Sequence, residues 1–357
     1  MRRREVLAGA ASLAALAGCT APERAQRGGS LPLPAGPLRS VAFASCIDQT
    51  KPAPIWDTVL AGKPDLFVFG GDNVYCEMPY SLERLRRAYA QAAESPGMSQ
   101  LRRTVPHMAV WDDNDMGLND GGADFPFKAE SKAEFVEFFK LAADDPRRRR
   151  EGLYDAQVIG PPGRRVQVLM LDVRWFRSPW KRTDQRDAPG KERYVPDDSP
   201  DKTMLGEAQW RWLEAQLRVP AQLRLLVSGI QVVTDGHGWE RWGNFPRERQ
   251  RLYRLIAQTG AQGVVFLSGD RHIGGLYREA GGTPYPCYEM TSSGMTHPWR
   301  TASEAGPNRL GELFTDYHYG TVDIDWELSA LSLSLRDIGG KPQRSVGIPF
   351  NYLQAAA

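Results

Sequence analysis

Short apolar runs alternate with amphipathic segments along residues 38–267. Runs rich in β-branched, aromatic and aliphatic residues predict buried strands, and segments whose apolar positions recur at helical spacing predict helices. The expected strands are residues 41–44, 65–69, 107–110, 166–171, 223–227 and 263–267, and the expected helices are residues 52–61, 82–93, 131–142, 206–217 and 247–259. This alternation is typical of a layered α/β protein.

The pattern changes after Ser268, where only strands are expected. These are residues 287–291, 321–326 and 331–335, and the last run alternates strictly between apolar and polar positions, so a second sheet could close here. Residues 181–203 are rich in Asp, Arg, Pro and Lys without periodicity. They predict a long surface loop, of a length that is often functional or mobile. We expect one large domain over residues 38–357.

The first residues predict export and lipid anchoring rather than a part of the fold. Arg2-Arg3-Arg4 resembles a twin-arginine signal, and the apolar run of residues 6–17 is too short to span a bilayer. Leu16-Ala17-Gly18-Cys19 resembles a lipobox. We therefore expect a signal peptide over residues 1–18, acylation of Cys19 and a tether over residues 19–37. Because Thr20 follows the cysteine, the expected location is the periplasmic side of the outer membrane.

The composition excludes few classes of protein. The 357 residues are 41% hydrophobic and 25% charged, which is ordinary for a globular protein. The net charge is only +2 and no basic stripe is interleaved with aromatic residues, so a nucleic-acid partner is not expected. The single basic run, residues 147–150, predicts a solvated helix end or loop, with a phosphate or membrane contact as the alternative.

Three cysteines remain after Cys19: Cys46, Cys76 and Cys287. In an oxidising compartment an odd number cannot all be paired, so at least one thiol is left over. A disulfide between Cys76 and Cys287 is possible, although connectivity does not follow from sequence.

Several expected strands are followed by polar side chains that suit metal ions. Because α/β sheets hold ligands beyond the carboxyl ends of their strands, we expect these side chains to converge. Clustered carboxylates repel one another and lose hydration, a cost that cations or hydrogen bonds offset, although an exposed acidic turn is the alternative. The residues that follow the strands are Cys46, Asp72, Asn73, Tyr75, Asp112, Asp113, Asp115, Asp270 and His272.

The chemistry of these ligands indicates two unlike metals. A thiolate, a phenolate and a carboxylate together suit ferric iron, whereas Asp and Asn oxygens suit calcium or magnesium. Each residue also has a purely structural alternative. Cys46 could be a small buried apolar residue, Tyr75 a core ring and His272 a hydrogen-bonded histidine at a strand end.

The motifs that carry these residues resemble the PhoD-like alkaline phosphatase family of the calcineurin-like metallophosphoesterases. The resemblance extends in order over about residues 38–326. The motifs are Ser45-Cys46-Ile47-Asp48-Gln49, Gly71-Asp72-Asn73-Val74-Tyr75, Trp111-Asp112-Asp113, Leu267-Ser268-Gly269-Asp270-Arg271-His272 and Thr291-Ser292-Ser293-Gly294.

The resemblance implies a four-layer αββα sandwich of two mixed sheets flanked by helices, with a bimetal site at the strand ends. It implies Asp72 as the bridging ligand. Asp112 and Asp115 are expected to support the ligands. The implied ligands of Fe3+ are Cys46, Asp72, Tyr75 and His272, those of Ca2+ or another divalent metal are Asp72, Asp113 and Asp270, and the implied substrate contacts are Asn73, Asn114 and Arg271.

The chain departs from the family at Asn114, where the family carries histidine. An imidazole can donate a proton to the leaving oxygen, whereas an amide cannot titrate. Asn114 is therefore the catalytic anomaly, and His237 is an alternative proton donor, with His297 a weaker one. His107 and His318 are expected to be structural.

We therefore expect an exported, lipid-anchored phosphoesterase that hydrolyses small phosphomonoesters or phosphodiesters by metal-activated water. A pair of cations is a common device for in-line attack on phosphate, and no nucleophilic-serine elbow, Walker loop or His-Glu-x-x-His motif is present. The alternative, motivated by Asn114, is a catalytically impaired metal- or phosphate-binding lipoprotein. Nothing in the sequence specifies an oligomer.

Overall fold

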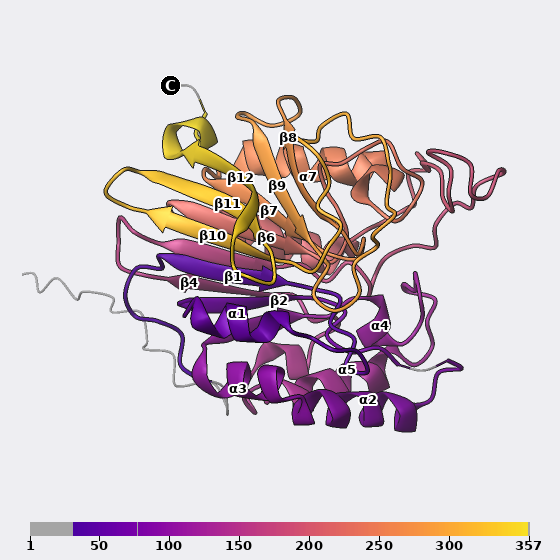
Figure 1. Ribbon diagram of the computed structural model, residues 1–357. Coiled ribbons are helices and arrows are strands. Elements are labelled where there is room, and N and C mark those ends of the chain that lie inside the picture. Colours follow the sequence, from indigo (N-terminus) through magenta and orange to yellow (C-terminus); the bar gives the residue numbers. More distant parts are fainter. Residues whose placement is uncertain (1–30, 77, 356–357) are drawn as a thin grey trace, which may run out of the picture.

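The computed structural model describes residues 31–76 and 78–355 (Figure 1). The expected signal peptide, the acylation site Cys19 and residues 20–30 of the expected tether lie outside this range. Within the described part of the chain, no helix combines the length and apolar character needed to cross a bilayer.

Two six-stranded mixed sheets pack face to face at the centre of the molecule (Figure 1). The first sheet, in spatial order, contains β12 (Pro342–Pro349), β11 (Ala330–Arg336), β10 (Tyr319–Asp325), β1 (Ser40–Ala44), β2 (Leu66–Gly70) and β3 (His107–Val110). The second contains β4 (Asp155–Ile159), β5 (Val166–Met170), β6 (Leu223–Ser228), β7 (Val264–Ser268), β9 (Cys287–Ser292) and β8 (Gly274–Glu279).

Helices cover the outer face of each sheet, which completes four layers (Figure 1). Trp56 of α1 packs on Phe67 of β2, with ring centroids 5.7 Å apart, and the side chain of Gln167 in β5 donates to the carbonyl of Gln216 in α6. The helices of the first sheet are α1 (Ile55–Ala61), α2 (Leu82–Glu94), α3 (Pro96–Thr104) and α5 (Lys128–Phe138), and those of the second are α6 (Gly206–Leu217) and α7 (Pro246–Thr259). The predicted αββα sandwich is confirmed.

Strand direction explains why polar residues gather at one end of the sandwich. β1, β2 and β3 run parallel, and so do β5, β6, β7 and β9. The loops that follow these strands therefore emerge at the same end of each sheet. The short helix α4 (Asp113–Met116) begins there, directly after β3.

The strands β4, β8 and β12 and the helix α3 were not predicted. All three strands lie at sheet edges. β4 and β12 contain exposed positions, so a continuous apolar run is not required there. β8 is largely buried and its outer side pairs with residues 308–314, but it begins with two glycines, which carry no strand signal. β12 also begins with Pro342, a residue confined to strand edges and starts. Helix α5 begins and ends earlier than expected, whereas residues 181–203 form the predicted irregular loop.

The structure settles one pairing that the sequence left open and corrects one expectation in part. Cys76 and Cys287 form no disulfide with each other. The basic run is only partly solvated, because Arg147 is buried and lies 2.9 Å from Asp145 and 3.7 Å from Asp155, while Arg150 stacks on a tyrosine ring. Burial of these guanidinium groups makes the run a structural element of the fold.

Candidate metal centre

Predicted ligands from both sheets meet at the strand ends and form a cluster that we call the cysteine half. Cys46, Asp72 and His272 each offer one ligand atom, and these atoms lie within 4.8 Å of one another. The Cys46 sulfur is 3.6 Å from Asp72 Oδ2. The Tyr75 hydroxyl lies 3.0 Å from the same oxygen and 3.3 Å from His272 Nε2. The four predicted iron ligands are thus neighbours.

Carboxylates continue the cluster away from the cysteine. Asp72, Asp112 and Asp113 form a second group of ligand atoms within 4.8 Å of one another, and Asp113, Asp120 and Glu240 form a third. Because neighbouring groups share Asp72 and Asp113, the three groups adjoin. Asp270 belongs to none of the three groups found among the described residues.

The backbone at four predicted ligands is left-handed. Cys46, Asp72, Asp270 and His272 have φ angles of 59°, 52°, 69° and 55°. Such angles are uncommon for residues other than glycine, and they cluster at functional sites. Gly71, at φ 102°, allows the β2 loop to approach the β3 loop, because a Cβ atom there would lie 2.6 Å from the Asp112 Cβ.

Burial and mutual repulsion favour the neutral forms of the ionisable groups in the cysteine half. Burial, reinforced by Asp113 and other carboxylates, raises the pKa of Asp72 well above its usual range. Burial also raises the pKa of the Cys46 thiol and the Tyr75 phenol, and Asp72 adds to both shifts. Burial and the nearby His297 lower the pKa of His272 to about 3. A bound cation would reverse this balance by favouring the anionic ligands.

The rest of the cluster, by contrast, contains an arginine. We call Arg174 and the carboxylates around it, Asp112, Asp113, Glu240 and Asp270, the Arg174 half. The fully buried guanidinium of Arg174 donates to Asp112 through Nε and to Glu240, 2.6 Å away, through Nη1. Its Nη2 lies 4.0 Å from Asp113 and 3.8 Å from Asp270. This half therefore contains its own positive charge.

The arginine has unequal effects on its two carboxylate partners. Burial opposes ionisation of Glu240, but Arg174 and Arg177 lower the pKa of that carboxyl to about 2. Burial outweighs Arg174 at Asp112 and raises its pKa to about 7. The positive charge of Arg174 thus favours ionisation of Glu240 more than ionisation of Asp112.

Buried polar atoms without a partner test whether the cluster fits metal ions. Within the cluster, the buried oxygens Asn73 Oδ1, Asp112 Oδ2 and Glu240 Oε2 have no hydrogen-bond partner among the described residues, and neither has the Nη2 of Arg174. Native proteins leave few such oxygens unsatisfied, and hard cations bind carboxylate and amide oxygens. The oxygens here and the thiol, phenol and imidazole of the cysteine half are therefore a suitable set of ligands for metals.

The two predicted asparagine contacts hold carboxylates in place. Asn114 donates from its backbone to Asp72 Oδ1 at 3.1 Å and from its side chain to Asp72 Oδ2 at 3.2 Å and Asp113 Oδ1 at 2.8 Å. The Asn73 amide donates to the carbonyl of Val110 and to Asp115. Asp115 thus supports Asn73, and Asn114 orients the shared ligand Asp72.

The histidines divide between the centre and the surrounding loops. His237 is fully buried, with one ring nitrogen 3.0 Å from Gln231 Oε1 and the other accepting from the Trp239 backbone, which favours a structural role over proton donation. His297, the weaker candidate, lies beside the predicted ligands, with ring centroids 4.1 Å from His272 and 4.9 Å from Tyr75.

Arg271 is held by its own neighbours. Its guanidinium lies 2.8 Å from Glu304 and stacks against Trp239 and Trp299, at 5.0 and 5.7 Å from the ring centroids. Both members of the ion pair are nearly buried. Its predicted contact with substrate stays a prediction.

Asp120, Glu240 and Arg174 were not predicted as members of the centre. They lie in irregular loops, where no periodicity marks a functional residue. The local signals are short, Asn119-Asp120-Gly121-Gly122 and Trp239-Glu240-Arg241-Trp242. The sequence signal for a functional residue in these segments is a charged residue next to glycines or tryptophans.

The family profile described as PhoD-like phosphatase matches residues 41–280. The chain belongs to the PhoD-like phosphatase family. Alkaline phosphatase D of Bacillus subtilis (strain 168) is 23% identical over 221 residues, which are 54% of this chain and 35% of that protein. The match therefore spans about a third of that relative's length. All members of the three ligand groups lie within the matched residues.

Solved structures agree with this fold. The structure of PhoD has a TM-score of 0.73 at 18% identity, with 90% of this chain and 72% of that chain covered. Purple acid phosphatase PPD1 from yellow lupin (Lupinus luteus) seeds has a TM-score of 0.59 at 12% identity, with 89% and 55% covered. Likeness at these identities shows the shared sandwich.

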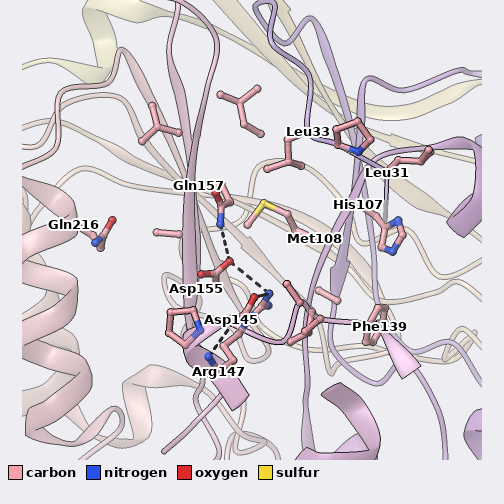
Figure 2. Close-up of a pocket in the computed structure, with 18 of the residues that line it drawn as sticks. Leu31, Leu33, His107, Met108, Phe139, Asp145, Arg147, Asp155, Gln157 and Gln216 are labelled. Atoms are coloured by element: carbon pink, nitrogen blue, oxygen red, sulfur yellow. Dashed lines mark hydrogen bonds and ion pairs between the residues drawn. The ribbon is translucent and has the colours of Figure 1, made fainter. Parts of the chain in front are cut away.

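A cavity of about 550 Å³ lies apart from the centre of this PhoD-like chain, between the edge strands β3 and β4 (Figure 2). Leu33 and Met108 contribute apolar walls, and the ion pairs of Arg147 with Asp145 and Asp155 lie among the lining residues. None of the predicted metal ligands lines it. The cavity is therefore distinct from the candidate metal centre.

Proposed function

We propose that the protein is an exported, lipid-anchored phosphoesterase that hydrolyses small phosphomonoesters or phosphodiesters. The observation that carries the proposal is the adjoining set of ligand groups that share Asp72 and Asp113. We propose Fe3+ in the cysteine half and Ca2+ beside Asp113 and Asp270, because thiolate and phenolate suit the first ion and carboxylate oxygens suit the second.

The chain's own residues position and balance the reacting groups. Bound cations would neutralise phosphate oxygens and lower the pKa of a water nucleophile. Asn114 orients Asp72 through two hydrogen bonds, and the Asp120 backbone donates to Asp113 Oδ2 at 2.6 Å. Both shared carboxylates are thus fixed by backbone or amide donors, which preorganises the site.

Asn114 determines which esters are expected to react. Its amide donors point to Asp72 and Asp113, and an amide cannot deliver a proton to a leaving oxygen. Leaving groups of low pKa need the least protonation. Aryl esters are therefore the expected good substrates and alkyl esters the poor ones.

The second candidate function is metal or phosphate binding with little hydrolysis. The observation that favours it is also Asn114, because loss of general-acid help commonly costs about 10²- to 10⁴-fold in rate. Both functions require the same metal ligands, so they differ only in turnover.

The test measures metals and turnover together. Iron and calcium are quantified in the purified protein, the visible spectrum is recorded for the phenolate-to-iron band, and aryl mono- and diesters are assayed for the wild type and Asn114→His. If both metals are absent and neither the wild type nor Asn114→His hydrolyses an ester, the proposal of an enzyme is wrong. Activity in Asn114→His alone would favour the binding function.

Cys46→Ala probes the cysteine half separately. The expected result is loss of the coloured iron with retention of the fold, because the thiol is a proposed ligand in a buried position that alanine can occupy. Full colour and activity in this variant would contradict the assignment of Cys46. Circular dichroism of the variant checks the fold.

We propose export by the twin-arginine route and acylation at Cys19 on the basis of the signal-like sequence at the start of the chain. Globomycin treatment of producing cells should block processing, and fractionation should place the mature protein with membranes. A Cys19→Ala variant is the control, since it removes the acylated thiol. A mature wild-type protein that is soluble and unacylated would contradict the proposal.

A further inference from the structure

A cleft of about 470 Å³ opens beside the candidate metal centre, and we call it the basic cleft. Three arginines line it, Arg182, Arg186 and Arg193, together with Tyr194 and one acidic residue, Asp120. The arginines come from the predicted surface loop of residues 181–203, to which the sequence assigned no specific role. Three positive groups around one cavity favour an anionic ligand.

The basic cleft shares a wall with the metal centre. The Asp120 backbone donates to the predicted ligand Asp113 at 2.6 Å, and the Asp120 carboxylate accepts from Arg193 Nη1 and from the Tyr194 hydroxyl, each at 2.7 Å. One residue therefore separates a predicted metal ligand from the arginine side chains. A substrate held at the metal centre could extend into the cleft.

The counter-charges within the described part of the chain do not balance the arginines. Arg193 is paired with Asp120, and Arg186 lies 3.8 Å from Asp187, where both side chains are mostly exposed. Arg182 forms no ion pair with any described residue and is exposed. The cleft therefore carries net positive charge on the side that faces solvent.

The loop that carries the arginines is built on a frame of backbone hydrogen bonds. Arg182 and Tyr194 form an isolated antiparallel bridge, and the Thr183 backbone donates to the Arg193 carbonyl at 2.9 Å. The backbones of Arg193 and Tyr194 both donate to the Gly238 carbonyl, at 3.0 and 2.7 Å. This frame fixes the positions from which the side chains extend, which lowers the entropy cost of binding.

We propose that the basic cleft binds a second anionic group, a phosphate or a carboxylate, of the phosphate ester whose scissile phosphate lies at the metal centre. Guanidinium groups match both anions through paired charged hydrogen bonds. The inference rests on the proposed function and narrows it to esters that carry a further negative charge. Esters without that charge would lack the additional contacts.

The test compares three aryl phosphates that differ only in a side arm, which ends in a methyl ester, a carboxylate or a phosphonate. The wild type should prefer the two anionic substrates in kcat/KM, mainly through KM. Arg182→Ala with Arg186→Ala should reduce this preference about tenfold, the size of one or two exposed charged contacts. The carboxylate and phosphonate arms identify which anion the cleft prefers.

Arg103→Ala with Arg218→Ala is the matched control, because it removes two exposed arginines elsewhere and changes the net charge equally. A preference that falls equally in this control would overturn the proposal in favour of general electrostatic attraction. A preference that is unchanged in the cleft variant would overturn it as well.

Calorimetric titration with 1,4-butylenediphosphonate separates this inference from the proposed function. If the wild type hydrolyses no ester but binds this probe, and the cleft variant binds it about tenfold more weakly, the hydrolytic function fails and the anion site stands. If the wild type hydrolyses the esters and the cleft variant binds the probe equally well, the anion site fails alone.

Discussion

The two halves of the candidate metal centre balance their charges in different ways. The cysteine half, Cys46 with Asp72, Tyr75 and His272, contains no cationic side chain, and burial displaces the pKa values of its groups towards their neutral forms. The Arg174 half places a guanidinium among its carboxylates. The first half therefore lacks an internal counter-charge, whereas the second is partly neutralised by the fold.

Asp72→Asn should have the largest effect, because this carboxylate belongs to two ligand groups. We expect loss of bound iron and a fall in hydrolysis that exceeds the roughly 10- to 100-fold typical when an outer partner of a ligand is changed. In chelator-treated protein the variant should unfold at an equal or higher temperature, since it removes a buried carboxyl whose ionisation the fold opposes. Elemental analysis and thermal melts measure both.

Asp124→Asn is the control for this variant, because Asp124 is exposed. Retained iron in Asp72→Asn would show that the cysteine half binds metal without its shared carboxylate.

Arg174→Met should destabilise the protein by about 3–5 kcal/mol, because it leaves Asp112 and Glu240 as buried charges without their partner. Added calcium should recover part of this stability if a divalent ion can replace the guanidinium. Denaturant unfolding with and without calcium measures the effect. Arg218→Ala, which breaks an exposed ion pair with Glu214, should change stability by less than about 1 kcal/mol. Equal losses in both variants would show that Arg174 does not balance the cluster.

Asn114→His should raise the rate on alkyl phosphate esters by about 10²-fold and alter aryl esters less, because a proton donor is added beside Asp72 and Asp113. Asn114→Ala is the paired variant, since it removes the same hydrogen bonds without adding a titratable group. The ratio of alkyl to aryl kcat/KM is the measurement. A similar ratio in the wild type and in Asn114→His would show that proton donation does not limit the reaction.

The pH dependence of metal-free protein should reveal the same charge imbalance. Burial raises the pKa values of Asp112, Asp115 and Asp120 to about 7, so between about pH 4 and 7 the folded state binds more protons than the unfolded state. Stability from these groups is present at low pH and is lost as the pH rises through 7, by up to about 1.4 kcal/mol per pH unit for each proton.

Cation binding should remove much of that loss. The melting-temperature difference between metal-loaded and chelated protein should therefore widen from pH 5 to pH 8. A difference that is constant over this range would mean that these carboxyls do not sense the cation.

Much of the fold was predictable because interior strands carry continuous apolar runs. β1, β2, β5, β6 and β7 were found in this way. The missed strands β4, β8 and β12 lie at sheet edges. Exposed positions in β4 and β12 interrupt the apolar run that marks a strand, and β8 begins with two glycines. The interior of a sheet is thus encoded locally, whereas its boundaries depend on which segments pack beside it.

The residues of the candidate site likewise divide into those with a local sequence signal and those whose role depends on packing. Cys46, Asp72, Asp113 and His272 each follow a predicted strand, so their convergence followed from topology. Arg174 was not predicted, because its role depends on a fully buried guanidinium that contacts carboxylates from two distant loops. Asp145 and Arg147 likewise gain meaning only from the packing that buries them.

The left-handed backbone at Cys46, Asp72, Asp270 and His272 has a consequence for engineering. Each such residue costs about 1–3 kcal/mol relative to a relaxed conformation, and glycine would remove that cost at every one of these positions. A procedure that ranks substitutions by folding stability alone would therefore favour replacing the predicted ligands first. Stabilised variants of this protein should be selected with these four positions held constant.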